Sequence, residues 1–141
     1  MSSTPERELI QMVTFRLGRE EYAVDVMDVR EIVEVEEVTR LATAPPHVEG
    51  VIDLRGSVVP IVSLRRSFGM STGDGLSPGC VAIMDYAGTL TGFMIDEVSD
   101  VIRVARRDIL PPIEVAAQPW IEGIVSLENR LVVVMDLKHF A

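Results

Sequence analysis

The sequence has few of the residues that build covalent or metal-dependent sites. Its 141 residues contain one cysteine and two histidines, so an internal disulfide and a cysteine-type zinc site are both excluded. Cys80 precedes an apolar run, which is typical of a small core residue. His47 and His139 stand apart from one another and match no familiar ligand spacing. The sequence therefore predicts no metal site and no cofactor.

Basic residues and long apolar runs are also scarce. Thirteen Lys and Arg against 22 Asp and Glu give a net charge of −9, which argues against nucleic acid and against an anionic membrane surface. No apolar run reaches the ~18 residues of a spanning helix, and residues 1–8 lack the apolar core of a signal segment. We therefore expect a cytoplasmic protein with no nucleic-acid partner and no direct membrane binding.

The familiar catalytic motifs are missing as well. The sequence has no phosphate-binding loop, no dinucleotide-binding glycine pattern and no nucleophile elbow. An enzyme needs a convergent set of nucleophile, acid, base or metal ligands, so the sequence favours a non-enzymatic protein. The contrasting hypothesis is a small β-barrel hydrolase or ligand-binding protein, which would require a convergent polar pocket and a perturbed titrating group.

Apolar residues, in contrast, are plentiful, and their pattern repeats. Hydrophobic residues make up 48% of the chain and aromatics only 5%, and the dominant valine and isoleucine favour an all-β fold. Residues 48–64 recur at residues 121–137 with a constant shift of 73 (121 minus 48, and 137 minus 64). A shift of half the chain indicates a duplicated unit. Each half is marginal alone at its length, so we expect the halves to share an interface.

The pattern of apolar residues predicts the local elements. Residues 1–8 are expected to be a flexible N-terminus, and two strands follow between residues 9 and 24. Asp25 is a candidate helix cap, and apolar residues from Val26 to Val33 recur at helical spacing, which predicts a short helix. The same arrangement recurs after Asp96.

The central hairpin spans residues 48–64. Gly56 supplies its turn, Gly50 marks a bulge or a close packing position, and the second strand is apolar on both faces and expected to be buried on both. The stretch 69–79, rich in Gly and Ser, is the expected linker. The predicted subdomains are therefore residues 9–70 and 78–141.

Arg55 is the position where the two copies differ most in charge. It corresponds to Glu128 in the second hairpin, 73 residues on. Arginine is enriched at interface hot spots because it offers five donors in a rigid fork. The alternative, an intramolecular ion pair with Asp53 or Glu31, stays open at this point.

The central hairpin resembles the signature of a known family. The matching residues are Val38-Thr39-Arg40-Leu41, Pro45 to Gly56, and Val59 to Arg65, with support from Phe15 to Tyr22 and from Val98-Ser99-Asp100-Val101. This pattern is similar to that of CheW, the adaptor family that links bacterial chemoreceptors to the histidine kinase CheA. Asp53 departs from the family, where asparagine is common.

The resemblance implies both fold and function. The fold would be two SH3-like five-stranded β-barrel subdomains packed together, with short helical turns and room for strand exchange at the N-terminus. The protein would be a non-enzymatic scaffold adaptor for the regulatory domain of CheA and the cytoplasmic tip of a methyl-accepting chemoreceptor, recruited to membrane arrays through these partners. A related hypothesis is an adaptor for another chemosensory pathway, controlling pili, gliding or a second messenger.

The resemblance also points to partner-binding residues. By position, Val26, Val29, Glu31 and Arg55 fall where relatives contact the receptor or the kinase. We expect Val26, Val29 and Val51 to supply an apolar patch, and Glu31 and Arg55 to supply orientation. Gly50 and Gly56 are expected to have structural roles.

Overall fold

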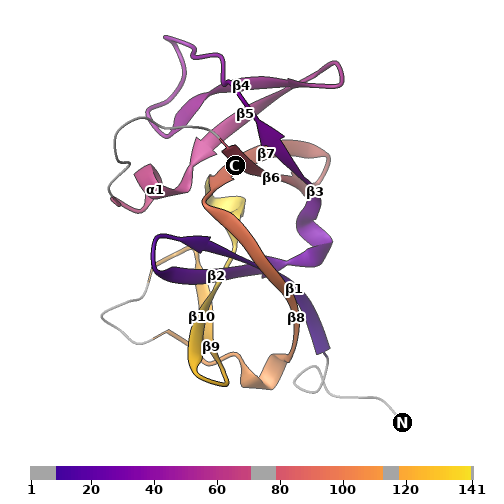
Figure 1. The fold of residues 1–141 in the computed structure, drawn as a ribbon, viewed down its shortest axis with the longest axis vertical. Helices are drawn as coiled ribbons and strands as arrows, with labels where there is room; N and C mark the ends of the chain where they lie inside the picture. Colours follow the sequence, from indigo (N-terminus) through magenta and orange to yellow (C-terminus); the bar gives the residue numbers. More distant parts are fainter. Residues whose placement is uncertain (1–8, 71–78, 113–117, 141) are drawn as a thin grey trace. The chain divides into compact units, whose positions relative to one another are not determined.

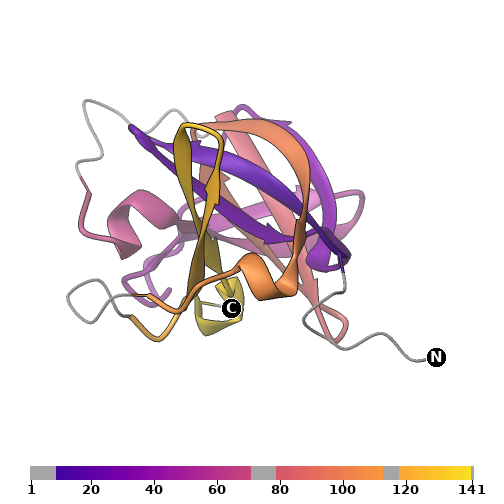
Figure 2. The ribbon, with the colours of Figure 1, turned by 90° about the horizontal axis from the view of Figure 1, so that it is seen from below.

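The computed structural model of this protein describes residues 9–70, 79–112 and 118–140. Within these ranges, ten strands form two five-stranded sheets, and the other elements are short helical turns (Figure 1; Figure 2 gives a second view). The predicted all-β class is thereby confirmed. In the same ranges, no helix is long and apolar enough to cross a membrane.

The chain divides into two compact units. Unit 1 comprises Met1–Met27 and Val98–His139, and unit 2 comprises Asp28–Glu97 and Phe140–Ala141. The sheet of unit 1 has the order β8-β1-β2-β10-β9. Its strands are β1 (Leu9–Leu17), β2 (Glu20–Asp25), β8 (Glu97–Ala105), β9 (Ile121–Leu127) and β10 (Arg130–Met135), and its 3-10 turns are η2 (Val26–Asp28), η3 (Arg106–Asp108) and η5 (Leu137–Phe140).

Unit 2 repeats this arrangement. Its sheet has the order β3-β6-β7-β5-β4. The elements are β3 (Val29–Val35), β4 (Val48–Leu54), β5 (Ser57–Ser63), the short helix α1 (Leu64–Ser67), β6 (Gly79–Tyr86) and β7 (Thr89–Ile95). In both units two antiparallel hairpins meet through a parallel pair, β2 with β10 in unit 1 and β5 with β7 in unit 2.

These units do not follow the contiguous halves 9–70 and 78–141. The parallel pairs join strands of different repeats, so β1 and β2 complete the sheet of the second repeat, and β6 and β7 complete that of the first. The chain therefore passes between units at Met27–Asp28 and at Glu97–Val98. Most of the expected linker, residues 71–78, and the N-terminal residues 1–8 lie outside the described residues.

Each unit has its own apolar core. Both cores draw on strands of both repeats, because each sheet contains strands of both. Along every strand the inward-facing residues alternate with outward-facing ones. The core of unit 1 contains Met12, Ala23, Val104, Val125, Val132 and Val134, and that of unit 2 contains Ile52, Val59, Ile61, Val81, Ile83 and Met94. Neither contiguous half supplies a complete core, so the two halves fold together.

The helix predicted after Asp25 is wrong beyond its first turn. Asp25 does cap η2, because its Oδ1 accepts the Met27 amide at 2.9 Å. From Val29 to Val35 the chain is a strand in which half-buried and exposed residues alternate. The apolar residues in this stretch also recur at a spacing of two, and pairing with β6 selects that period. Likewise, the stretch after Asp96 is strand β8.

Two burial expectations also need correction. The second hairpin strand, β5, was expected to be buried on both faces, yet Val58 is 72% exposed, since only one face of the strand is covered at the turn end. Cys80 is half-buried instead of buried in the core, because it lies at the start of β6, where the sheet ends.

Candidate docking site

The turn between β4 and β5 holds Arg55 in an unusual backbone conformation. Arg55 has φ 50° and Gly56 has φ 91°, which are the two positive φ values of a tight two-residue hairpin turn. The Gly56 amide donates to Asp53 Oδ1 at 2.8 Å. Asp53 therefore stabilises the turn, and the Arg55 side chain projects from it toward the rest of unit 2.

Gly50 lies where β4 meets the chain segment before it. The register of β4 against β5 shifts between Val48 and Gly50, as in a β-bulge. Val51 exchanges two backbone hydrogen bonds with Thr39, at 2.8 and 2.9 Å. A Cβ atom at position 50 would lie 2.1 Å from the Thr39 carbonyl oxygen. Only glycine permits this close approach of the two backbones.

Arg55 forms an ion pair with Glu31 of β3. This pair answers the open question between Asp53 and Glu31, because the Asp53 carboxylate is used by the turn. The Arg55 side chain stays 68% exposed, whereas Glu31 is 27% exposed. The hydrogen bond to Glu31 raises the pKa of Arg55 above its ordinary value.

The position of Glu31 explains why it needs a partner. In β3 the half-buried residues include Val29, Glu31 and Val33, and their neighbours Arg30, Ile32 and Glu34 are exposed. Glu31 is thus a carboxylate on the apolar side of the strand, where an unpaired charge is costly. Since β3 and β4 are the two ends of the unit 2 sheet, the ion pair also draws these ends together.

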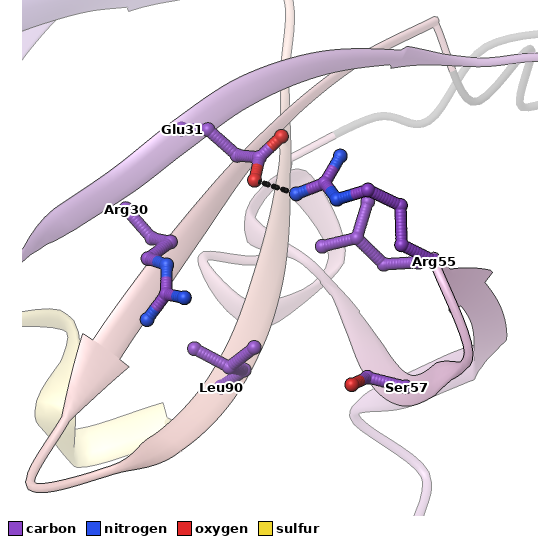
Figure 3. A pocket seen from close by; sticks show the side chains of 6 residues that line it. Arg30, Glu31, Arg55, Ser57 and Leu90 are labelled. Atoms are coloured by element: carbon purple, nitrogen blue, oxygen red, sulfur yellow. Dashed lines mark hydrogen bonds and ion pairs between the residues drawn. The ribbon is translucent and has the colours of Figure 1, made fainter.

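A pocket of about 230 Å³ lies at this ion pair. Figure 3 shows the Glu31 and Arg55 side chains pointing toward one another, with Arg30, Ser57 and Leu90 around them. Leu54 completes the lining. Arg30 is itself held by Asp85 at 3.3 Å. Two arginines and a paired carboxylate are suited to binding a polar or charged group, and they offer no base poised beside a nucleophile.

The structure gathers only part of the predicted site. Glu31 and Arg55 line one pocket, but Val29 and Val51 are half-buried and do not line it. Val26 lies in η2 and is assigned to unit 1. Sequence reasoning missed Val58, which is 72% exposed beside the turn. The period of two would have found it, because Val59 and Ile61 face the core.

The residue types that could ligate a metal are His, Cys, Asp and Glu. Among the residues that the structure describes, no group of three or more His, Cys, Asp or Glu could hold a metal ion. The shifted pKa values within these ranges belong to Tyr22, Arg55 and Arg65, and each of these groups donates a hydrogen bond to a carboxylate, that of Glu20, Glu31 and Asp96 respectively.

Comparison with known proteins agrees with this description. The model of the CheW-like domain matches residues 11–141. The chemotaxis protein CheW of Treponema pallidum is 34% identical over 92% of this chain and 81% of its own, and that of Rhizobium meliloti is 32% identical over 90% and 84%. The crystal structure of the scaffolding protein TtCheW from Thermoanaerobacter tengcongensis superimposes with a TM-score of 0.83 at 28% identity, covering 92% of this chain and 90% of that one.

Proposed function

This chain belongs to the CheW-like domain family, and we propose that it is a scaffold adaptor that couples chemoreceptors to the histidine kinase CheA in bacterial chemotaxis. The proposal is supported by relatives named as chemotaxis CheW proteins along nearly the whole chain and by a structural neighbour described as a scaffolding protein. Its action would consist of binding alone, without a catalytic step.

The adaptor would hold two partners at once. One is the regulatory domain of CheA, and the other is the cytoplasmic tip of a methyl-accepting chemoreceptor. The protein would work in the cytoplasm and reach membrane arrays through these partners. A scaffold transmits a signal when its partners' conformations bind it with different affinities, so receptor state would bias the kinase through the shared complex.

The exposed guanidinium of Arg55 is the observation that carries the docking role. Glu31 holds it in the lining of the unit 2 pocket while leaving it 68% exposed, and the same hairpin carries an exposed apolar side chain at Val58. Arginine is among the residues enriched at interface hot spots. We assign Arg55, Glu31 and Val58 to the docking surface, with further apolar contact from Val26, Val29 and Val51.

Titration calorimetry tests this function. The chain is titrated with the isolated regulatory domain of CheA from the same cell, and separately with a receptor hairpin fragment. Saturable binding in the micromolar range is expected for at least one of them, and it should weaken on Val51→Thr or Arg55→Ala. Absence of binding by folded protein would contradict the adaptor function.

A related pathway is the second candidate. The protein PilI of Pseudomonas aeruginosa is 26% identical over 83% of this chain and 67% of its own length. An adaptor of that kind would bind the kinase and receptor of its own pathway. The same titration with the kinases of every chemosensory cluster in the cell separates a chemotaxis adaptor from an adaptor of another pathway. The cognate kinase should bind at least tenfold more tightly, a difference of roughly 1.4 kcal/mol in binding free energy.

A further inference from the structure

Unit 1 has a pocket of its own beside the β9–β10 hairpin. Its volume is about 380 Å³. The lining combines apolar side chains with three arginines and two glutamates: Arg16, Arg19, Glu20, Glu21, Ile124, Arg130, Leu131 and Val133. Leu131 is 65% exposed at the rim. Nothing in the coupling role proposed above uses this pocket.

Glu21 is the residue that makes this pocket a binding site. Its side chain is only 8% exposed, and its Oε1 lies 3.4 Å from Arg130 Nε. No donor in the described part of the chain reaches its other oxygen, Oε2, which is buried. A buried carboxylate oxygen without a donor is unfavourable. Glu21 lines the pocket, so a turn of its side chain toward the pocket would let a bound molecule donate a hydrogen bond to Oε2 and relieve that cost.

The charges of the lining limit what that molecule is. Three arginines and two glutamates leave the pocket with one net positive charge, so a basic group on the bound molecule would be repelled. An anionic group would approach the buried carboxylate of Glu21 and be repelled there. Glu20 already accepts the Tyr22 hydroxyl at 2.7 Å. A neutral donor on an apolar body therefore fits the lining best.

Aromatic side chains with an N–H or O–H group meet these requirements. The body of tryptophan or tyrosine would pack on Ile124, Leu131 and Val133, and guanidinium groups stack readily on aromatic faces. The polar edge would donate to Glu21 Oε2, as buried indole and phenol groups require. Such residues are also enriched at interface hot spots.

We propose that this unit 1 pocket is a second docking site, which accepts a tryptophan or tyrosine side chain of a partner protein as donor to Glu21. The inference does not depend on which partner binds unit 2. It gives the adaptor a site whose selectivity comes from one buried hydrogen bond, in contrast to the exposed ion pair of the unit 2 pocket.

Methyl NMR with small probes tests the proposal without knowledge of the partner. N-acetyl-tryptophanamide should bind in the millimolar range and shift the methyl signals of Ile124, Leu131 and Val133. Its indole N-methyl analogue keeps the amide donors but has no ring N–H to donate to Glu21, and it should bind roughly tenfold more weakly. Glu21→Gln should weaken the parent probe by a similar factor and leave the N-methyl analogue unchanged.

The matched control is Glu49→Gln. Glu49 is an equally buried carboxylate of unit 2, 9% exposed and paired with Arg66 at 3.1 Å, so its loss should leave probe binding unchanged. Leu131→Ser, at an exposed position that does not endanger folding, should weaken both probes. Equal binding of the two indole probes to wild-type protein would overturn the proposal. So would stronger binding of N-acetyl-argininamide or of an acidic analogue, or no methyl shifts at the solubility limit.

Discussion

The β4–β5 hairpin of unit 2 and the β9–β10 hairpin of unit 1 share their backbone conformation at the turn, but the turn residues carry opposite charges. Arg55 and Glu128, 73 residues apart, have φ values of 50° and 49°. Each hairpin has a register shift beside a buried glycine, Gly50 or Gly123. The backbone features survived the duplication, because they depend on close packing that few residues satisfy.

The side chains around the two tips follow no such rule. In unit 2 the half-buried face of β3 carries Glu31, which pairs with Arg55, and β7 supplies Leu90 to the pocket. In unit 1 the core-facing residues of β8 include Ile102 and Val104, and the buried carboxylate, Glu21, comes from β2. Surface side chains at a turn are constrained by partners, so the two tips are free to serve different ones.

The largest expected effect concerns the two glycines. A Cβ at position 50 would lie 2.1 Å from the Thr39 carbonyl oxygen, and one at position 123 would lie 2.5 Å from that of Leu110. Gly50→Ala should reduce the free energy of unfolding by roughly 3 kcal/mol or more, and Gly123→Ala by about 1–3 kcal/mol. Gly50→Asp adds a buried charge and should prevent folding of unit 2.

Thermal and urea unfolding of the three variants measure these differences. A Gly123→Ala variant less stable than Gly50→Ala would contradict the expectation that the shorter Cβ contact costs more stability. An unchanged melting temperature for Gly50→Asp would show that the close approach of β4 to Thr39 is not required.

Arg55→Ala and Glu128→Ala test whether the two tips have different roles. Arg55→Ala should weaken binding of the receptor or kinase fragment roughly tenfold without loss of fold, because it removes an exposed anchor. Glu128→Ala has the same backbone strain and should leave that binding unchanged. Calorimetry gives the affinities, and circular dichroism the fold. A large drop in melting temperature with intact binding would show that Arg55 is merely structural.

A charge exchange sharpens the same test. The double variant Glu31→Arg with Arg55→Glu should restore the ion pair and leave the melting temperature near that of the wild type, since exposed pairs contribute little to stability. Binding should stay at the level of Arg55→Ala if a partner contacts the guanidinium. Full recovery of binding would mean that only the pair, and not Arg55 itself, matters.

Val58 and Leu131 occupy equivalent places just after the two turns, 72% and 65% exposed. Val58→Ser should weaken binding of the partner fragment to unit 2 by roughly threefold, through loss of apolar contact. Leu131→Ser should leave that affinity unchanged and weaken only the binding of the aromatic probe to unit 1. Two titrations per variant are sufficient, and an effect of Leu131→Ser on both ligands would contradict separate sites.

The smallest expected effect concerns stability at alkaline pH and a tyrosine of unit 1. Burial and the hydrogen bond to Glu20 raise the pKa of Tyr22 above its ordinary value of 10.0. The stability that this shift provides is complete below about pH 10 and is lost as pH rises toward the folded-state pKa. Tyr22→Phe should therefore flatten the decline of stability with pH above about 10. Parallel alkaline slopes for the two proteins, measured by urea unfolding, would contradict this.

Several features of the candidate site could be predicted from sequence. The turn at Gly56, the constraint at Gly50 and the contrast between Arg55 and Glu128 all follow from local residue types and from comparison of the two copies. The partner of Arg55 could not be chosen, because Glu31 and Asp53 were equally plausible along the chain. Val58 was misjudged as buried, since an apolar run does not show where the covering layer ends.

The sequence by itself determined the all-β class, the duplication and the hairpins, because alternation, turn residues and a shift of 73 act over short distances or repeat along the chain. Only the tertiary structure decided that the two repeats exchange hairpins. The two repeats offer similar apolar faces, so β2 pairs with β10 and β5 with β7, and no local signal distinguishes these partners. The same pairing made Val29–Val35 a strand and brought Glu31 to Arg55, since strand contacts override the helical spacing of a few valines.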